Sequence, residues 1–280
     1  MTRSRKIRIL KKSGLEEAFD SSKMYDSLIN TGASADAVRE VIRLIEREIR
    51  PGMSTRRIYR LAKKHLRQID RPSGMRYSLK DSIYALGPSG FPFEKYIASI
   101  FRLKGYRTKV GQIVKGQCVT HEVDVIATSD KEQIMMECKF HRNGNKHSDV
   151  KIAMYVDSRF RDIAKSLRAQ PSPTVKFSGA LVTNTRLTSE AIKYAECTGL
   201  RAIAWKYPRA GGLEQLIETT GAYPVTMLPC ATRAVIEKLT SKAIVLARDI
   251  NSLSASKLSR RTGIDLKIAE RLKAQCSDIL

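Results

Sequence analysis

The sequence predicts an α/β protein whose mixed β-sheet core is flanked by helices, with a mostly helical region before it and a small helical region after it. Strand-like and helix-like segments alternate with short links over residues 93–205, which is typical of an α/β domain with a mixed sheet. Apolar residues recur at helical spacing in the regions before and after it. Gly87-Pro-Ser-Gly-Phe-Pro92 separates the first region from the second. We therefore expect domains at 1–86, 87–210 and 211–280.

The first domain is expected to begin with a short strand and continue as helices. Residues 5–12 alternate like a strand, and Ser13-Gly14 supplies a turn. Asp20 is placed to cap a helix that begins near Ser22. Further helices are expected over 35–49, from Ser54 or Thr55 to Leu66, and over 77–86.

The remaining elements follow from apolar periodicity. In the second domain, the expected strands are 106–114, 121–128, 133–140, 175–183 and 200–205, and the expected helices are 93–103, 150–168 and 188–197. A looser connector that includes 213–218 leads to a helical region over 229–280. Two short helices flank Thr262-Gly263-Ile264 there.

Charge predicts the kind of partner. The chain has 51 basic and 28 acidic residues, a net charge of +23, and each third of it is positive. Nucleic acid is the most economical polyanionic partner, although an anionic membrane surface or a generally basic proteome would also account for the charge. No apolar run approaches the roughly 18 residues that span a bilayer. Five irregularly spaced cysteines do not suggest a disulfide framework, so we expect a cytoplasmic protein. A homo-oligomer is a separate expectation that the sequence leaves open.

The stretch His121-Glu-Val-Asp-Val to Glu137-Cys-Lys-Phe-His141 places charges inside two strand-like runs. With a turn at Asp130-Lys131, positions whose numbers sum to 261 lie opposite each other, so Asp124 would face Glu137 and Glu122 would face Lys139. Period 2 also places Glu137 and Lys139 on one face.

Two facing carboxylates repel unless a cation lies between them, and hard oxygen ligands suit Mg²⁺ or Mn²⁺. Such an ion could activate water, and Lys139 could meet the developing negative charge. A solvated cross-strand ion pair is the alternative. Cys118, His121, Cys138 and His141 also have a zinc-like spacing, but the expected register splits them between two faces of the sheet.

Val-Asp124-Val followed by Glu137-Cys-Lys139 resembles the D…(D/E)-x-K core of restriction-endonuclease-like nucleases. Phe93-Glu94, followed by Gly105-Tyr106, is similar to the first helix of Mrr-like catalytic domains. The resemblance covers about 88–206. It implies a restriction-endonuclease-like fold with Asp124 and Glu137 as metal ligands, Lys139 as the catalytic lysine and Glu94 as an accessory acid. His141 and Glu122 are second-tier candidates on the same face.

The segment from Lys11-Lys12-Ser-Gly14 through Phe19-Asp20 to Lys23 resembles the start of an ATP-cone, a regulatory nucleotide-binding domain. Thr55-Arg-Arg-Ile58 resembles a later helix start of that family, although Lys12 replaces the usual arginine. The resemblance implies that Lys11, Lys12 and Lys23 meet the phosphates of ATP or dATP, with Glu17 and Thr55 also at the nucleotide. A basic surface facing DNA is the competing interpretation of these lysines.

Residues 256–272 resemble a helix-hairpin-helix, with Lys257, Arg260, Arg261 and Lys267 available for phosphate, but an ordinary capped helical pair explains them equally well. Together the patterns predict a Mg²⁺-dependent DNA endonuclease regulated by nucleotide. The alternatives are a structure-selective repair nuclease, such as a junction resolvase, and a nucleotide-responsive DNA-binding regulator that does not cut. Intact Asp124, Glu137 and Lys139 argue against the last.

Overall fold

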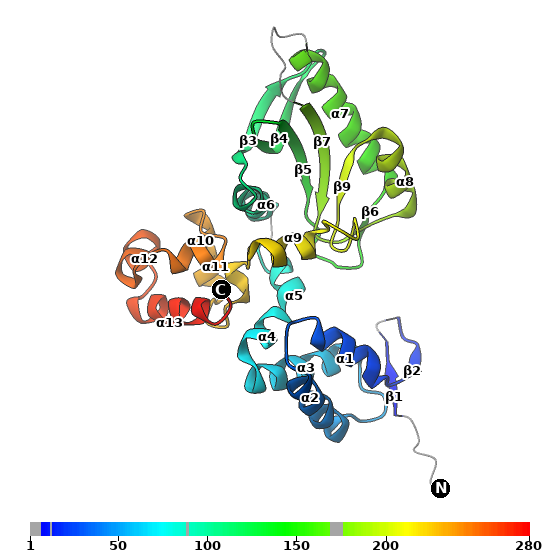
Figure 1. Ribbon diagram of the computed structural model, residues 1–280, viewed down its shortest axis with the longest axis vertical. Coiled ribbons are helices and arrows are strands. Elements are labelled where there is room, and N and C mark those ends of the chain that lie inside the picture. The colour runs from blue at the N-terminus through cyan, green and yellow to red at the C-terminus, as the bar shows by residue number, and fades with distance from the viewer. Residues whose placement is uncertain (1–6, 12, 88–89, 169–175) are drawn as a thin grey trace. The chain divides into compact units, whose positions relative to one another are not determined.

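The computed structural model describes residues 7–11, 13–87, 90–168 and 176–280. They divide into two compact units, one up to Leu79 and the other from Lys80 to Asp278 (Figure 1). Lys12, one of the predicted phosphate contacts, lies outside the described residues, as do the first residues of two predicted strands.

The first unit packs helices around a small apolar core. Its elements are β1 (Arg8–Leu10), β2 (Glu16–Ala18), α1 (Ser21–Ile29), α2 (Ala35–Glu48), α3 (Thr55–Ile69) and α4 (Arg71–Arg76). The predicted cap is confirmed, because the Asp20 side chain accepts hydrogen bonds from the N–H groups of Ser22 and Lys23. Val38, Val41 and Ile45, which follow the helical period of α2, are fully buried in the core.

The second unit is built on a five-stranded mixed sheet, as the sequence predicts. The strands are β3 (Arg107–Lys115), β4 (Thr120–Thr128), β5 (Glu132–Lys139), β7 (Lys176–Thr183) and β9 (Arg201–Ile203), in the order β3-β4-β5-β7-β9. The first three are antiparallel, whereas β5, β7 and β9 run parallel. Val125 pairs with Met136 and Thr128 with Gln133, so the predicted register, in which paired numbers sum to 261, is confirmed over this ladder.

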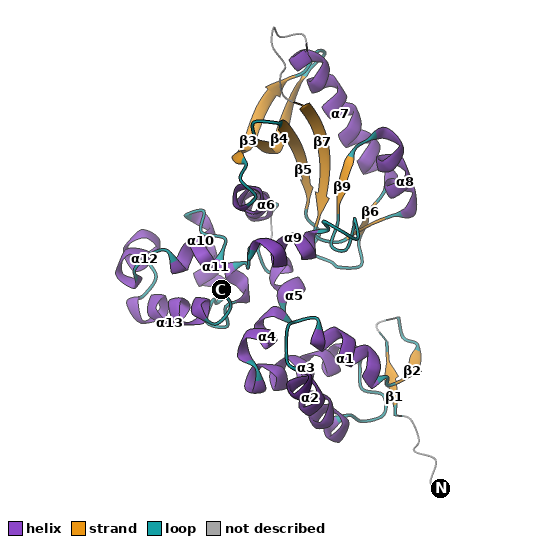
Figure 2. Ribbon diagram, viewed as in Figure 1, coloured by secondary structure: helices purple, strands orange, loops and turns teal. Residues whose placement is uncertain are grey.

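Helices cover both faces of this sheet (Figure 2). On one face, α6 (Phe91–Leu103) lies against β3, β4 and β5; on the other lie α7 (Val150–Arg168) and α8 (Ser189–Thr198). A core forms on the second face, where Met135 and Leu181 from the sheet meet Phe160 and Ile163 from α7. At roughly 25 cal/mol per Å² of buried apolar surface, this packing, rather than helix propensity, holds α7 in place.

The remaining elements of the second unit are short. They are α5 (Leu79–Tyr84), β6 (His147–Ser148), β8 (Arg186–Leu187), α9 (Leu213–Thr220), the 3₁₀ turn η1 (Val225–Met227), α10 (Arg233–Ser241), α11 (Ala247–Asn251), α12 (Ala255–Thr262) and α13 (Leu266–Ser277). In the described part of the chain, no helix combines the length and apolar character needed to cross a bilayer.

Candidate active site

Asp124 lies where strands β4 and β5 stop pairing. The described ladder between them ends at Val125 and Met136, so Asp124 and Glu137 are not a ladder pair. Instead, Oδ2 of Asp124 accepts a hydrogen bond from the backbone N–H of Cys138 at 2.6 Å. This bond attaches the Asp124 carboxylate to the backbone of β5, next to Glu137.

Glu137 is held by a residue that sequence reasoning did not identify. Nη1 of Arg159, on α7, donates to Oε2 of Glu137 at 2.6 Å. Nη2 of the same guanidinium donates to the backbone carbonyl of Glu122. Arg159 follows Glu137 by 22 residues on a separate helix. Because no local spacing links the two, the sequence offers no motif that would pair them.

Glu94 approaches the same carboxylates from α6. Its neighbour Phe93 is buried and packs against Phe140, with ring centroids 5.5 Å apart, and Phe140 directly follows Lys139 of β5. Burial is the largest cause that raises the pKa of Glu94 to about 7, and the charges of Asp124 and other nearby carboxylates act in the same direction. The predicted accessory acid is therefore in electrostatic contact with the predicted metal ligands.

The pKa values of the two main carboxylates are also raised. Burial is the largest cause for Asp124, whereas the Cys138 N–H bond and the Arg159 charge act in the opposite direction. Burial and then the charge of Asp124 raise the pKa of Glu137, against the lowering effect of Arg159. Two half-buried carboxylates that each resist ionisation form a site that a divalent cation would stabilise.

The hydrogen bonds leave one oxygen on each carboxylate for such a cation. Among the described residues, Asp124 uses Oδ2 and Glu137 uses Oε2, whereas Oδ1 and Oε1 have no hydrogen bond. In the same part of the chain, no group of three or more His, Cys, Asp and Glu side chains is arranged to hold a metal. Two carboxylates nevertheless suit Mg²⁺, which commonly takes its other ligands from water and substrate phosphate.

Lys139 and His141 extend this site in different ways. Lys139 is exposed at the end of β5, and its charge helps to lower the pKa values of Asp124 and Glu137. His141 forms a hydrogen bond from Nε2 to Ser148 Oγ at 3.0 Å, and its backbone N–H donates to the Asn184 side chain at 2.8 Å. Burial lowers the pKa of His141. The second-tier residue His141 therefore has protein partners.

The four residues with zinc-like spacing do not share one set of contacts in the structure. His121 Nε2 donates to Oδ2 of Asp162, on α7, at 2.8 Å. The backbone N–H of Cys118 donates to Oδ1 of Asp162 at 2.9 Å, whereas Cys138 is buried in the sheet. Asp162 thus fastens the β3–β4 turn to α7, which is a structural role.

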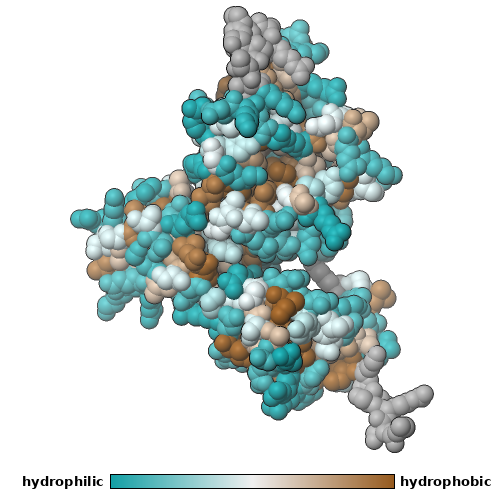
Figure 3. All heavy atoms as spheres, in the orientation of Figure 1, coloured by the Kyte–Doolittle hydropathy of each residue, from teal (hydrophilic) through white to brown (hydrophobic). Residues whose placement is uncertain are grey.

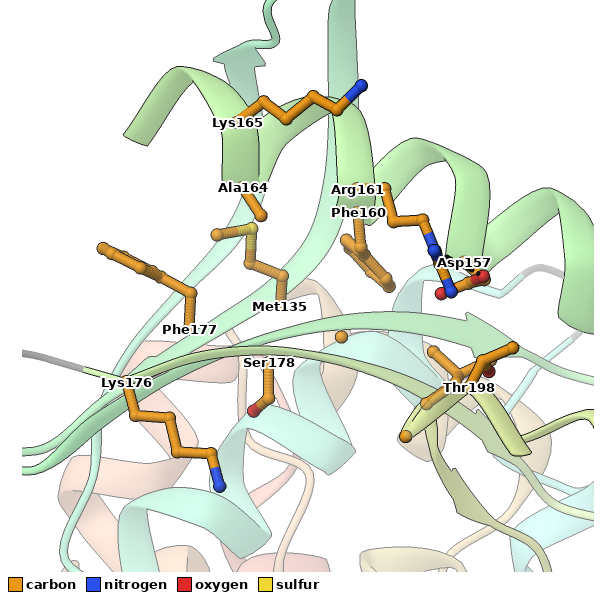
Figure 4. A pocket seen from close by; sticks show the side chains of 13 residues that line it. Met135, Asp157, Phe160, Arg161, Ala164, Lys165, Lys176, Phe177, Ser178 and Thr198 are labelled. Carbon is orange, nitrogen blue, oxygen red and sulfur yellow. Dashed lines mark hydrogen bonds and ion pairs between the residues drawn. The ribbon is translucent and has the colours of Figure 1, made fainter. Parts of the chain in front are cut away.

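Two cavities lie along α7. One of about 750 Å³, which we term the α7 groove, includes Tyr155, Ser158, Arg159, Arg161 and Lys165 in its lining. Another, of about 420 Å³, lies between α7 and the sheet, where Met135, Phe160 and Phe177 gather (Figure 4). This second cavity contains none of the predicted site residues.

In the first unit, the structure brings together several of the predicted nucleotide contacts. Glu17, Lys23 and Thr55 line one cavity of about 190 Å³, whose lining also contains Ile9, Phe19, Asp20, Met24, Ile58, Tyr59 and Tyr77. Lys11 is not in that lining, but its Nζ pairs with Oε2 of Glu17 at 2.6 Å. Lys23 lies 3.8 Å from Asp20 Oδ2.

In the C-terminal helical region, α12 and α13 flank Gly263 as the sequence predicts. Gly263 has φ of +68°, the left-handed conformation that ends α12. The Asp265 carboxylate accepts hydrogen bonds from the N–H groups of Lys267 and Ile268, groups that a phosphate would need at the start of α13. This favours the capped helical pair over the helix-hairpin-helix.

Two family models match the chain. Residues 87–206 match a restriction endonuclease catalytic domain, and residues 223–280 match the family described as "AF1548-like, C-terminal". Neither match reaches residues 1–86. The first match supports a nuclease domain with the mixed α/β architecture described above.

Individual proteins are also similar to this chain. An uncharacterized protein of Archaeoglobus fulgidus is 36% identical over 184 residues, which are 66% of this chain and 99% of that protein. The crystal structure of AF1548, a protein of unknown function, is 33% identical, with a TM-score of 0.56 over 70% of this chain and 96% of that one. Can2 from Sulfobacillus thermosulfidooxidans, in complex with cyclic tetra-adenylate, is 14% identical with a TM-score of 0.32, too low to support an argument. The chain belongs to the AF1548-like family and contains a restriction endonuclease domain.

Proposed function

We propose that this protein is a metal-dependent DNA endonuclease that hydrolyses phosphodiester bonds. The observation that carries the proposal is the arrangement of Asp124 and Glu137. Each carboxylate has one oxygen held by a hydrogen bond and one oxygen without such a bond among the described residues. Lys139 lies two residues from Glu137 on the same strand.

Each residue has a defined part in the proposed reaction. Asp124 and Glu137 hold Mg²⁺ or Mn²⁺, and Glu94, with a pKa of about 7, can accept or hold a proton beside them. When bound, the ion supplies a more acidic water and stabilises charge on a phosphoryl oxygen. Lys139 positions the attacking water or meets the developing negative charge.

DNA as the substrate agrees with the surface. The net charge of +23 attracts a polyanion, and hydrophilic residues are spread over the face shown in Figure 3. In the C-terminal helices, Lys257, Arg260, Arg261 and Lys267 are all exposed. They can contribute contacts to phosphates that do not depend on sequence.

The test is cleavage of supercoiled plasmid by the purified chain. We expect nicked or linear product with Mg²⁺ or Mn²⁺ and none with EDTA, because two repelling carboxylates need the cation to act together. Linear duplex and a four-way junction, offered in parallel, separate a general endonuclease from a structure-selective repair nuclease. If Mn²⁺ produces no cleavage of any of the three DNAs, the protein is not the proposed nuclease, and DNA binding alone would support the regulator.

We further propose that the first unit binds ATP or dATP and thereby regulates cleavage. The cavity lined by Glu17, Lys23 and Thr55, with Tyr59 and Tyr77 beside them, supports this. Tyr59 and Tyr77 have ring centroids 4.9 Å apart and offer an apolar surface for a base. The cavity of about 190 Å³ is smaller than the roughly 300–1,000 Å³ typical of ligand sites, so binding requires side chains such as Lys23 to move.

Replacing Lys23 with alanine is expected to weaken ATP and dATP binding. Hydrogen bonds to charged groups contribute about 1.5–3 kcal/mol, which corresponds to a loss of about 10-fold or more in affinity. Calorimetric titration of the metal-free chain measures it. Lys64→Ala, at an exposed lysine on α3, is the matched control and should leave the affinity unchanged. Equal affinities for the wild type and both variants would remove Lys23 from the site.

A further inference from the structure

Arg159 reaches the candidate active site from α7 and is well shielded there. Its side chain is 15% exposed, and that of its partner Glu137 is 22% exposed. The Arg159 guanidinium carbon also lies 5.2 Å from the ring centroid of Tyr155, within the range of a cation–π contact. An arginine fixed on two sides in this way has little rotational freedom left, so it can define the position of the carboxylate that it contacts.

The guanidinium also connects two strands at the point where they separate. One of its nitrogens bonds Glu137 of β5, and the other bonds the carbonyl of Glu122 of β4. The described β4–β5 ladder has already ended at Val125 and Met136. Beyond the end of the described ladder, Arg159 therefore forms a side-chain bridge between β4 and β5 and holds the Glu137 carboxylate at one end of it.

The contact to Glu137 is selective for one oxygen. Arg159 occupies Oε2, and Oε1 keeps no hydrogen bond among the described residues. The N–H of Cys138 does the same for Asp124, where it occupies Oδ2 and leaves Oδ1. Groups that hold the outer oxygen of a ligating carboxylate orient the inner one toward a metal and are typically needed for full affinity.

We propose that Arg159 is a positioning residue that holds Glu137 ready to bind the divalent cation. It acts through Glu137 and need not touch the DNA. The inference rests on the proposed function of Asp124 and Glu137 as metal ligands, and it adds a residue from α7 that lies outside the D…(D/E)-x-K pattern.

Mn²⁺ binding to the metal-free chain, without DNA, tests this role by calorimetry or by electron paramagnetic resonance. We expect Arg159→Gln to weaken Mn²⁺ binding by about 10-fold or more and to lower Mn²⁺-dependent cleavage at sub-saturating Mn²⁺. Arg161→Gln is the matched control, because Arg161 is on the same helix, lines the same α7 groove and pairs with Asp157 instead. Arg161→Gln should bind Mn²⁺ as the wild type does.

Circular dichroism establishes that each variant folds. If Arg159→Gln does not fold, Arg159→Lys is measured, since lysine keeps the charge but cannot span both acceptors, and weaker Mn²⁺ binding is again expected. Mn²⁺ affinity equal to or above that of the wild type would overturn the proposal, and a higher affinity would mean that the guanidinium competes with the metal. A wild-type chain that binds no Mn²⁺ would overturn it too. Binding of Mn²⁺ without cleavage of any DNA would instead overturn the nuclease, while the affinities still decide the role of Arg159.

Discussion

Asp124→Asn is expected to abolish metal-dependent cleavage while making the metal-free protein more stable. The activity falls because an amide is a poor ligand for Mg²⁺, which prefers charged carboxylate oxygens. Replacing groups that merely orient a ligand costs about 10–100-fold, so we expect the loss of the ligand itself to exceed about 100-fold. Asparagine keeps an acceptor for the N–H of Cys138, so the local fold should survive.

The gain in stability follows from the pKa of Asp124. Burial raises that pKa above its ordinary value of 3.8, so the folded protein disfavours the ionised carboxylate. When the pKa is raised in the folded state, the contribution of that group to the free energy of unfolding is fully present at a pH below its unfolded-state pKa. This contribution is lost as the pH rises through its folded-state pKa. Asparagine does not ionise, so the variant avoids this loss at neutral pH. Each kcal/mol avoided raises Tm by roughly 2–4 °C in a protein of this size.

Thermal unfolding and plasmid cleavage, run on the same preparations, measure both effects. In EDTA at pH 7 the Tm of the variant should be higher than that of the wild type, and the difference between the two Tm values should disappear near pH 4. Mg²⁺ should raise the Tm of the wild type and leave that of the variant unchanged. Asp130→Asn, in the exposed β4–β5 turn, is the control and should change neither activity nor Tm. Normal cleavage by Asp124→Asn would remove Asp124 from the active site.

Sequence periodicity was sufficient for the elements that bury a regular apolar face. The helix over 35–49 and the strands near 121–128 and 133–140 agree with α2, β4 and β5 to within a residue or two. The hairpin register was also predictable, because the turn at Asp130-Lys131 fixes which residues lie opposite. The short strand pair β6 and β8 was missed, since each strand has only two residues and no period can be recognised in so few.

The candidate site was predictable only in the part that lies on one hairpin. Asp124, Glu137 and Lys139 share two adjacent strands, so their proximity follows from local pairing. The contact from Arg159 depends on how α7 packs over the sheet, a tertiary relation that leaves no spacing in the sequence. The sequence also predicted that Asp124 and Glu137 lie directly opposite each other in the ladder, and the described part of the structure does not show this pair. The strands separate at this point, where the Asp124 side chain accepts a hydrogen bond from the backbone of Cys138.

Lys139→Met is expected to lower cleavage by about 100- to 1,000-fold without weakening the binding of Mn²⁺. Removing one group that stabilises charge in the transition state typically costs this much. Lys139 is exposed, and its side chain has no ion pair among the described residues, so the fold should not depend on it. Because the ammonium repels a bound cation, its loss cannot reduce the affinity for Mn²⁺ through electrostatics.

The two active-site variants therefore separate two functions of one strand hairpin. Asp124→Asn should lose Mn²⁺ binding and cleavage together, whereas Lys139→Met should keep the first and lose the second. Single-turnover cleavage at saturating Mn²⁺ measures the chemical step, and DNA affinity in Ca²⁺ measures binding. Lys131→Met also removes one positive charge, at an exposed lysine in the β4–β5 turn about eight residues from Lys139. This variant should match the wild type in single-turnover cleavage and in DNA affinity. If Lys139→Met weakened DNA binding alone, with an unchanged single-turnover rate, Lys139 would serve to hold the substrate and not to assist the reaction.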